Sequence, residues 1–178
     1  MIKFDKAFDR LIGHEGNYSN EVDDPGNWTG GRIGKGELKG TKFGIAANTY
    51  GDLDIEHLTL AAAKDIYYRD WWLKAGADHF DAAVVFQLWD FAINAGMPTS
   101  IRALQRAASV ADDGNVGPLT IKAVQAMEPN DVLMRFCAQR LRYYTSLSTW
   151  KTFGRGWTRR VAGQLDYAAE DNPNKELT

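Results

Sequence analysis

The chain has 178 residues, of which 44% are hydrophobic, enough for one domain or for two small domains that share a core. Its formal net charge of −2 gives no general attraction to nucleic acid or to anionic lipid. One cysteine, Cys137, excludes an internal disulfide, and no stretch approaches the roughly 20 apolar residues of a transmembrane helix or forms a Sec signal peptide. We therefore expect no nucleic-acid partner and no stable membrane insertion.

The first predicted element is an amphipathic helix, whose buried face is marked by Phe4, Phe8, Leu11 and Ile12. Glu15 follows four residues after Leu11 and continues this face, just before a Gly-Asn helix stop. Desolvation on an apolar face raises the pKa of a carboxyl group, and a protonated carboxyl can donate a proton to a leaving oxygen. The alternative is a structural Glu15 that caps its helix or pairs with Arg10 or Lys6.

Asp24 follows in a turn-rich loop, with eight residues between it and Glu15 and four between it and Thr29. In the sequence Asp23-Asp24-Pro25-Gly26-Asn27, an aspartate is expected to be solvated and ionised. The alternative is that Asp24 only shapes the loop through an Asx turn. Two carboxyl groups in unlike environments are what acid-assisted cleavage of a glycosidic bond requires.

Two helices are predicted next, over residues 59–74 and 81–95, and the second has little exposed face and should be central. Its polar residues Gln87, Asp90 and Asn94 lie three and four apart on one narrow stripe, which needs partners if it is buried. Two interpretations remain open: an internal hydrogen-bond network, or the floor of a cleft that faces the sugar. In the helix over 59–74 the inward residues are Ala63, Ile66, Tyr67 and Trp71.

The C-terminal half is also helical by its hydrophobic period, with helices over 99–109, 118–127 and about 130–147 and a last amphipathic helix. Thr99 can cap the first of these after the break at 96–98. Cys137 is expected in the core. The inward residues are Leu133, Phe136, Leu141 and Tyr144 in the third helix, and Trp157, Val161, Leu165 and Ala168 in the last.

Residues 150–160 mix aromatic and basic side chains, and we interpret them as a loop that packs its aromatics on the core, or alternatively as a contact with an anionic cell envelope. The tail from Asn172 is expected to be disordered. Strand alternation is absent except for a possible small hairpin within residues 26–45. The predicted fold class is therefore mainly α.

Several of these patterns together resemble the glycoside hydrolase family 108 muramidases, which include phage endolysins. The resemblance begins with Glu15-Gly16-Asn17-Tyr18-Ser19-Asn20, Asp24-Pro25-Gly26 with Thr29, and Phe43-Gly44-Ile45. The spacing of Glu, Asp and Thr is also similar to that of T-even phage lysozymes, where the Thr comes one residue later. Further similarity lies in Ala61–Tyr67 with Trp71-Trp72, in Phe86–Gly96, and in residues 99–127, which resemble a peptidoglycan-binding segment.

The sequence departs from the family pattern at two places. Asn17 and Asn27 replace the second glycine of two Gly-Gly pairs, and asparagine tolerates the left-handed region, so both turns can survive. Residues 30–42 separate Thr29 from the Phe43-Gly44-Ile45 run, which typical members join directly to it. This insertion makes Thr41 a competitor for the role of Thr29.

The resemblance implies a lysozyme-like helical fold with a catalytic region over 1–96, a peptidoglycan-binding-like region packed on it over 97–171, and a tail over 172–178. It implies an N-acetylmuramidase that cleaves the β-1,4 bond between N-acetylmuramic acid and N-acetylglucosamine. The alternatives are a lytic transglycosylase and a non-catalytic peptidoglycan-binding protein. The implied catalytic residues are Glu15, Asp24 and Thr29, and the implied substrate-binding residues are Tyr18, Asn20, Thr41, Gln87, Asp90 and Asn94.

No metal or cofactor is expected, because His14, His57 and His79 are far apart and form no ligand motif. The expected partner is the peptidoglycan glycan strand, and the chain is expected to be a monomer. Since no Sec signal is recognised, we expect synthesis in the bacterial cytoplasm and action in the periplasm or cell wall after export by a holin or a dedicated secretion system.

Overall fold

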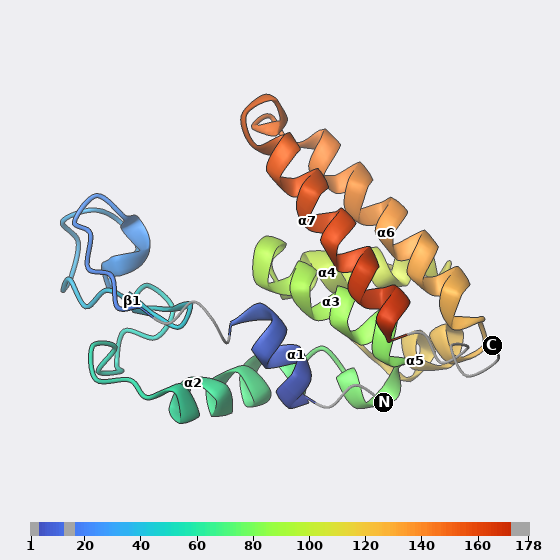
Figure 1. Cartoon of the computed structure of the whole chain (residues 1–178), viewed down its shortest axis with the longest axis horizontal. Helices are drawn as coiled ribbons and strands as arrows, with labels where there is room; N and C mark the ends of the chain where they lie inside the picture. The colour runs from blue at the N-terminus through green and yellow to red at the C-terminus, as the bar shows by residue number, and fades with distance from the viewer. Residues whose placement is uncertain (1–3, 13–16, 172–178) are drawn as a thin grey trace. The chain divides into compact units, whose positions relative to one another are not determined.

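The computed structural model describes residues 4–12 and 17–171. They form two compact units, one within Phe4–Arg69 and one from Asp70 onward. Figure 1 shows a mostly helical chain apart from the loop region over residues 17–59, which contains a two-stranded sheet. The mainly α fold class is confirmed.

The N-terminal unit contains the predicted first helix, α1 (Phe4–Leu11), and the helix α2 (Leu60–Tyr67). α1 buries Ala7 and Phe8, as its apolar period predicts. The ring of Phe8 meets that of Tyr67 edge-on, with 5.8 Å between centroids, and the ring of Phe4 meets that of Tyr68 at 5.1 Å. These aromatic contacts hold the two helices of the unit together.

The predicted hairpin is confirmed and joins β1 (Thr41–Lys42) to β2 (Ile45–Ala46) in antiparallel register. Its two turn residues, Phe43 and Gly44, have φ values of 52° and 75°. Positive φ at both central positions is the signature of a type I′ turn, whose twist matches that of the strands. The Tyr67 hydroxyl donates to the Phe43 carbonyl at 3.1 Å and fixes the turn on α2.

The helix predicted over 59–74 is interrupted. α2 ends at Tyr67 and a single π-helical turn follows, Tyr68–Trp72. A π turn takes one more residue than an α turn, so the inward position moves along the chain by one. Trp72, 3% exposed, is therefore the buried tryptophan in place of the predicted Trp71.

The second unit is a bundle around α3 (Ala82–Ala95), which contacts α4 (Met97–Ala107), α6 (Pro129–Ser146) and α7 (Trp150–Glu170). Figure 1 shows α6 and α7 side by side and antiparallel. The remaining helices are the short α5 (Pro118–Gln125) and a 3₁₀ turn at Ala77–His79. Eleven of the fourteen residues of α3 are buried, which confirms that it is central.

The break between α3 and α4 differs from the expectation. The break consists of Gly96 alone, whose φ of 87° is a conformation that favours glycine. α4 restarts at once at Met97, so Thr99 lies inside its first turn and is not the cap. Ser100, fully buried, donates to the Leu88 carbonyl at 2.6 Å and ties the two helices together.

Two inward positions were predicted wrongly. Leu141 is 37% exposed and Leu165 is 41% exposed, whereas the neighbouring Arg140 and Gln164 are buried. Residues one apart on a helix point about 100° away from each other, so burying the polar residue turns the leucine outward. The sequence-based assignment favoured the leucines because it counted only apolar side chains as inward. Cys137 is buried as predicted, and burial raises the pKa of its thiol to about 11.

Residues 150–160 are the first half of α7 and not a loop, which corrects the interpretation made from sequence. Trp157 stacks on Tyr144 of α6, with ring centroids 5.0 Å apart and planes 16° apart. Phe153 remains 54% exposed. Within residues 4–12 and 17–171, no helix combines the length and apolarity needed to cross a bilayer.

Candidate functional site

The N-terminal unit holds Asp24 at the start of a short 3₁₀ turn, Pro25–Asn27, which it caps. The Asp24 side chain is exposed, and its Oδ1 accepts a hydrogen bond from the Gly26 amide at 2.8 Å. This is the Asx turn that the sequence offered as the structural alternative. Among the described residues no hydrogen bond reaches Oδ2, so one oxygen orders the turn and the other is available to a ligand.

Asn27 organises the loop behind Asp24. It is fully buried, its Nδ2 donates to the Glu21 carbonyl at 3.0 Å, and its Oδ1 accepts from the Thr41 hydroxyl at 2.7 Å. Its own carbonyl accepts the amides of Lys39 and Gly40, both at 3.0 Å. The φ of Asn27 is not positive, so this turn does not depend on the tolerance of asparagine for the left-handed region. Its side chain is used instead as a buried cross-link between two loop segments.

The insertion after Thr29 folds back on itself. Trp28 pairs with Leu38 in a bridge, and the Thr29 amide donates to the Glu37 carbonyl at 2.9 Å. The Thr29 hydroxyl accepts from the Glu37 amide, also at 2.9 Å, and so belongs to this excursion. The chain then returns to Asn27, close to the point where the insertion begins.

Thr41 lies at the base of this excursion. It pairs with Ser19 in an antiparallel bridge, and its hydroxyl is bound to Asn27. The structure thus brings the segment around Tyr18, the turn around Asp24 and the first strand into one connected loop region. Thr29 and Thr41 each hold a structural hydrogen bond in this region, which leaves both in place as candidates for the third member of the site.

A polar pocket of about 320 Å³ lies beside Tyr18 in the same unit. Sequence reasoning did not single out the charged residues that line it, which are Lys39, Asp52, Asp54 and Glu56. The side-chain hydrogen bond from His57 lowers the pKa of Asp54, which is an exposed group. Asn20, the other predicted substrate contact of this segment, is exposed. Charged and hydroxyl groups around such a pocket suit the hydroxyls and amides of an amino sugar.

Glu15, the predicted acid, lies outside the described residues. The remaining predicted residues divide between the units, with Tyr18, Asn20, Asp24, Thr29 and Thr41 in the N-terminal unit. The second unit holds Gln87, Asp90 and Asn94 on α3.

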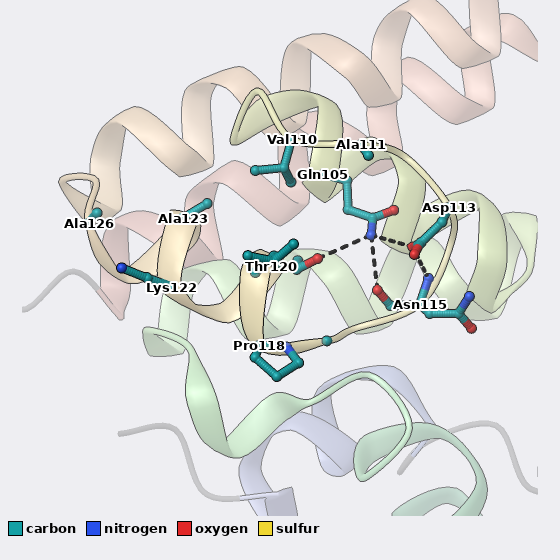
Figure 2. A pocket seen from close by; sticks show the side chains of 12 residues that line it. Gln105, Val110, Ala111, Asp113, Asn115, Pro118, Thr120, Lys122, Ala123 and Ala126 are labelled. Atoms are coloured by element: carbon teal, nitrogen blue, oxygen red, sulfur yellow. Dashed lines mark hydrogen bonds between the residues drawn. The ribbon is translucent and has the colours of Figure 1, made fainter.

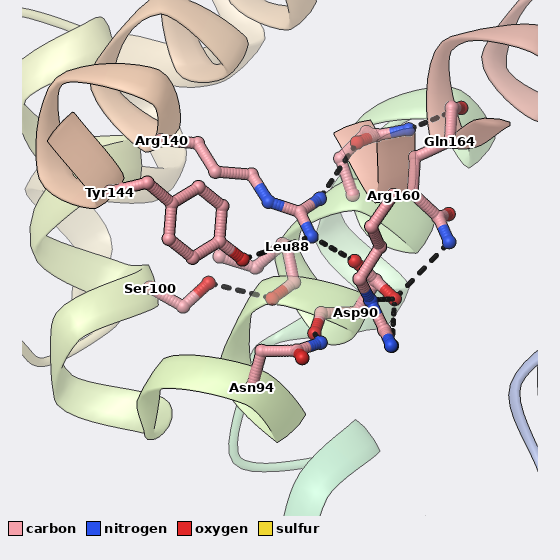
Figure 3. A network of polar contacts seen from close by, with 9 residues as sticks. Leu88, Asp90, Asn94, Ser100, Arg140, Tyr144, Arg160 and Gln164 are labelled. Carbon is pink, nitrogen blue, oxygen red and sulfur yellow. Dashed lines mark hydrogen bonds and ion pairs between the residues drawn. The ribbon is translucent and has the colours of Figure 1, made fainter. Parts of the chain in front are cut away.

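Asp90 is the centre of a buried polar network in the second unit (Figure 3). Its Oδ2 is paired with Arg140 of α6, and both side chains have no exposed surface. Its Oδ1 accepts from Arg160 of α7 at 2.6 and 3.0 Å and from Gln164 at 3.2 Å. One carboxylate on the central helix thus binds both helices that pack on it.

Gln87 extends the network one turn earlier on α3. Its Nε2 donates to the Gln164 carbonyl at 2.5 Å and its Oε1 accepts from Arg140 at 3.2 Å. Gln87 is fully buried, whereas Asn94 is exposed and donates to the Asp90 carbonyl at 2.8 Å. Of the two interpretations of the polar stripe, the geometry at Gln87 and Asp90 is that of the internal network and not of a surface that meets substrate.

Arg140 is one of the residues of this network that the sequence analysis did not predict. Burial by itself lowers the pKa of its guanidinium, but the Asp90 carboxylate and then Tyr144 more than offset this, and the pKa of Arg140 is raised. The guanidinium also lies over the Phe91 ring, 5.2 Å from its centroid. The signal available in the sequence was the polar stripe itself, because a buried carboxylate demands a cation from a neighbouring helix.

Comparison with known proteins assigns both halves of the chain. Residues 8–96 match the family model "Glycosyl hydrolase 108", and residues 99–162 match the model "Predicted Peptidoglycan domain". Together they make the protein a glycoside hydrolase that acts on peptidoglycan. The chain belongs to the glycosyl hydrolase 108 family, as the sequence motifs indicated.

Among solved structures, SagA of Brucella abortus is similar over 98% of both chains, at 30% sequence identity and a TM-score of 0.78. This similarity confirms the lysozyme-like, mainly α fold. No curated protein matches the sequence. The two family matches meet between residues 96 and 99, whereas the compact units meet at residue 70, because α3 packs with α4, α6 and α7.

Proposed function

We propose that the protein is an N-acetylmuramidase that hydrolyses the β-1,4 bond between N-acetylmuramic acid and N-acetylglucosamine. The observation that carries the proposal is Asp24, an exposed carboxylate held in its turn through Oδ1, whose Oδ2 accepts no hydrogen bond from the described residues. Its spacing from Glu15 and the family-108 match support a pair of carboxyl groups with different roles.

In this mechanism Glu15 protonates the glycosidic oxygen as the bond to the leaving sugar breaks. The carboxylate of Asp24 stabilises the positive charge that develops on the sugar ring, or orients the water that attacks it. The hydroxyl of Thr29 or of Thr41 holds that water. Tyr18 and the polar pocket beside it bind the neighbouring sugar.

The mass of the products tests the reaction. Hydrolysis of purified peptidoglycan is expected to release muropeptides with reducing N-acetylmuramic acid ends, each carrying the added water. A lytic transglycosylase instead forms 1,6-anhydro ends that are lighter by one water. Anhydro products from the wild-type chain, or binding to sacculi without any release of reducing ends, would refute the muramidase assignment.

Asp24→Asn separates the catalytic role of Asp24 from its structural one. Asparagine retains an oxygen for the Gly26 amide, so the turn is kept while the negative charge is removed. We expect the rate of reducing-end release to fall by about 100-fold, the loss typical for one electrostatic contact to a transition state. Asp23→Asn, at the exposed neighbouring position, is the matched control. Equal rates for the Asp24→Asn and Asp23→Asn variants would show that Asp24 only orders the turn.

The variants Thr29→Val and Thr41→Val, measured in the same assay, identify which of the two hydroxyls contributes to the reaction.

We place the action of the enzyme in the cell wall, as a monomer and in the manner of an endolysin. The resemblance to phage lysins supports this placement, with a holin or a dedicated secretion system providing export. Lysis of expressing cells that depends on a co-expressed holin is the expected result, and equal lysis without any export partner would contradict it.

A further inference from the structure

A second pocket, of about 590 Å³, lies in the segment that matches the peptidoglycan domain. Figure 2 shows that it is lined by α5 along its length, by the loop that precedes this helix, and by Gln105 of α4. The catalytic proposal uses none of these residues. The pocket and all of its lining lie within the second unit.

The wall of this pocket is held rigid by Gln105, which is 1% exposed. Its Nε2 donates to Asp113 Oδ1 at 2.7 Å, to the Asn115 carbonyl at 2.9 Å and to the Thr120 hydroxyl at 3.1 Å. Its Oε1 accepts from the Gly114 amide at 2.9 Å. Both ends of this buried amide thus bind the loop before α5, so Gln105 shapes the wall of the pocket.

The surface inside the pocket is mostly small and apolar, and no aromatic side chain lines it. Leu119, at the start of α5, is 80% exposed, which is the highest value among the exposed large hydrophobic residues of the described chain. A concave surface that exposes a group of apolar side chains is more often a binding site than an ordinary part of the protein surface is. The other apolar lining residues are Val110, Ala111, Pro118, Ala123 and Ala126.

Two opposite charges border this apolar surface, and Figure 2 shows them on opposite sides of it. Lys122 is exposed, and within the part of the chain that the structure describes its ammonium group makes no hydrogen bond or ion pair. Asp113 is exposed as well, and only its Oδ1 is used, by Gln105 and by the Asn115 amide at 2.8 Å. The hydrogen bond from Gln105 lowers the pKa of Asp113.

We propose that this pocket binds the stem peptide of peptidoglycan, an inference that rests on the proposed function. A stem peptide is short and alanine-rich, and it carries carboxylates together with the ammonium group of its dibasic residue. Its methyl groups fit the small apolar lining, a carboxylate pairs with Lys122, and the ammonium group pairs with Asp113. A glycan strand fits poorly, because its many hydroxyls would lose water against a lining that is mostly apolar.

The test measures binding of a soluble stem tetrapeptide, L-Ala-γ-D-Glu-meso-diaminopimelate-D-Ala, to the full chain by calorimetry. Leu119→Ala is expected to weaken binding about tenfold and Lys122→Gln about threefold. Both side chains are exposed, so neither change threatens the fold. Leu165→Ala and Lys151→Gln, at exposed positions of α7, are the matched controls and should bind as the wild type does. Asp113 is probed from the ligand side, by acetylating the free amine of diaminopimelate, because its own Oδ1 also holds the loop.

Wild-type affinity in both pocket variants, or no binding of the tetrapeptide at all, would overturn the inference. The inference would also be overturned if Leu119→Ala weakened the binding of an N-acetylglucosamine oligomer but left the binding of the tetrapeptide unchanged. Glycan strands stripped of their peptides by an amidase separate the two proposals. Cleavage of stripped strands without tetrapeptide binding refutes the pocket alone. Tetrapeptide binding without cleavage of stripped strands or of intact peptidoglycan supports the pocket and refutes the muramidase.

Discussion

Replacing Glu15 with glutamine should reduce the cleavage of purified peptidoglycan by a factor of about 10² to 10⁴, the usual contribution of general acid catalysis. Glutamine has nearly the size of glutamate but has no proton to give to the leaving oxygen. Release of reducing ends is the measurement, and co-sedimentation with sacculi should stay at the wild-type level, because the acid is needed for chemistry and not for attachment.

Glu21→Gln is the control for this substitution, since Glu21 is an exposed glutamate close to Glu15 in the sequence. It should leave the rate unchanged. If the Glu15 variant clears peptidoglycan at close to the wild-type rate, Glu15 is the structural residue that the sequence offered as the alternative, and the catalytic acid lies elsewhere.

Asp90→Ala should destabilise the protein by about 3–5 kcal/mol, the cost of leaving a buried charge without its partner. Arg140 has no exposed surface and would lose the carboxylate that balances it, whereas Arg160 is 37% exposed and can turn to solvent. The midpoint and slope of urea unfolding, followed by circular dichroism, give the free energy of unfolding.

Asp166→Ala, at an exposed position of α7, is the control and should change the free energy of unfolding by less than about 0.5 kcal/mol. The double variant Asp90→Leu with Arg140→Met removes both buried charges and should recover part of the loss. An Asp90→Ala protein as stable as the wild type would show that the network is not a net source of stability in the bundle.

The elements that follow from local pattern were predicted from the sequence. The apolar period gave α1 and the central α3, and the chemistry of Asp24-Pro25-Gly26 gave the turn that carries the proposed carboxylate. The features that were not predicted from the sequence are contacts between segments that lie far apart in the chain. The bond from Thr41 to Asn27 spans fourteen residues and the pairing of Arg140 with Asp90 spans fifty, and neither leaves a periodic signal.

The errors on α6 and α7 have the same origin. A polar stripe on α3 was recognised, but its consequence for the partner helices was not used. Once Asp90 is buried, a cation must face it, so Arg140 and Gln164 take inward positions and their leucine neighbours turn outward. Arg140 and Gln164 would have been predicted as inward if the polar stripes of neighbouring helices had been matched to one another, as the apolar stripes were.

The closure of the chain at Asn27 and Gly40 makes the loop between them a separable appendage. Its tip, around Ile33, is exposed, while its two ends are tied by main-chain hydrogen bonds to Asn27. Loops whose ends are already fixed tolerate changes in length at small entropic cost. The tip therefore offers a position for a fluorophore or an affinity tag that reports on wall binding while the neighbouring Asp24 turn keeps its shape.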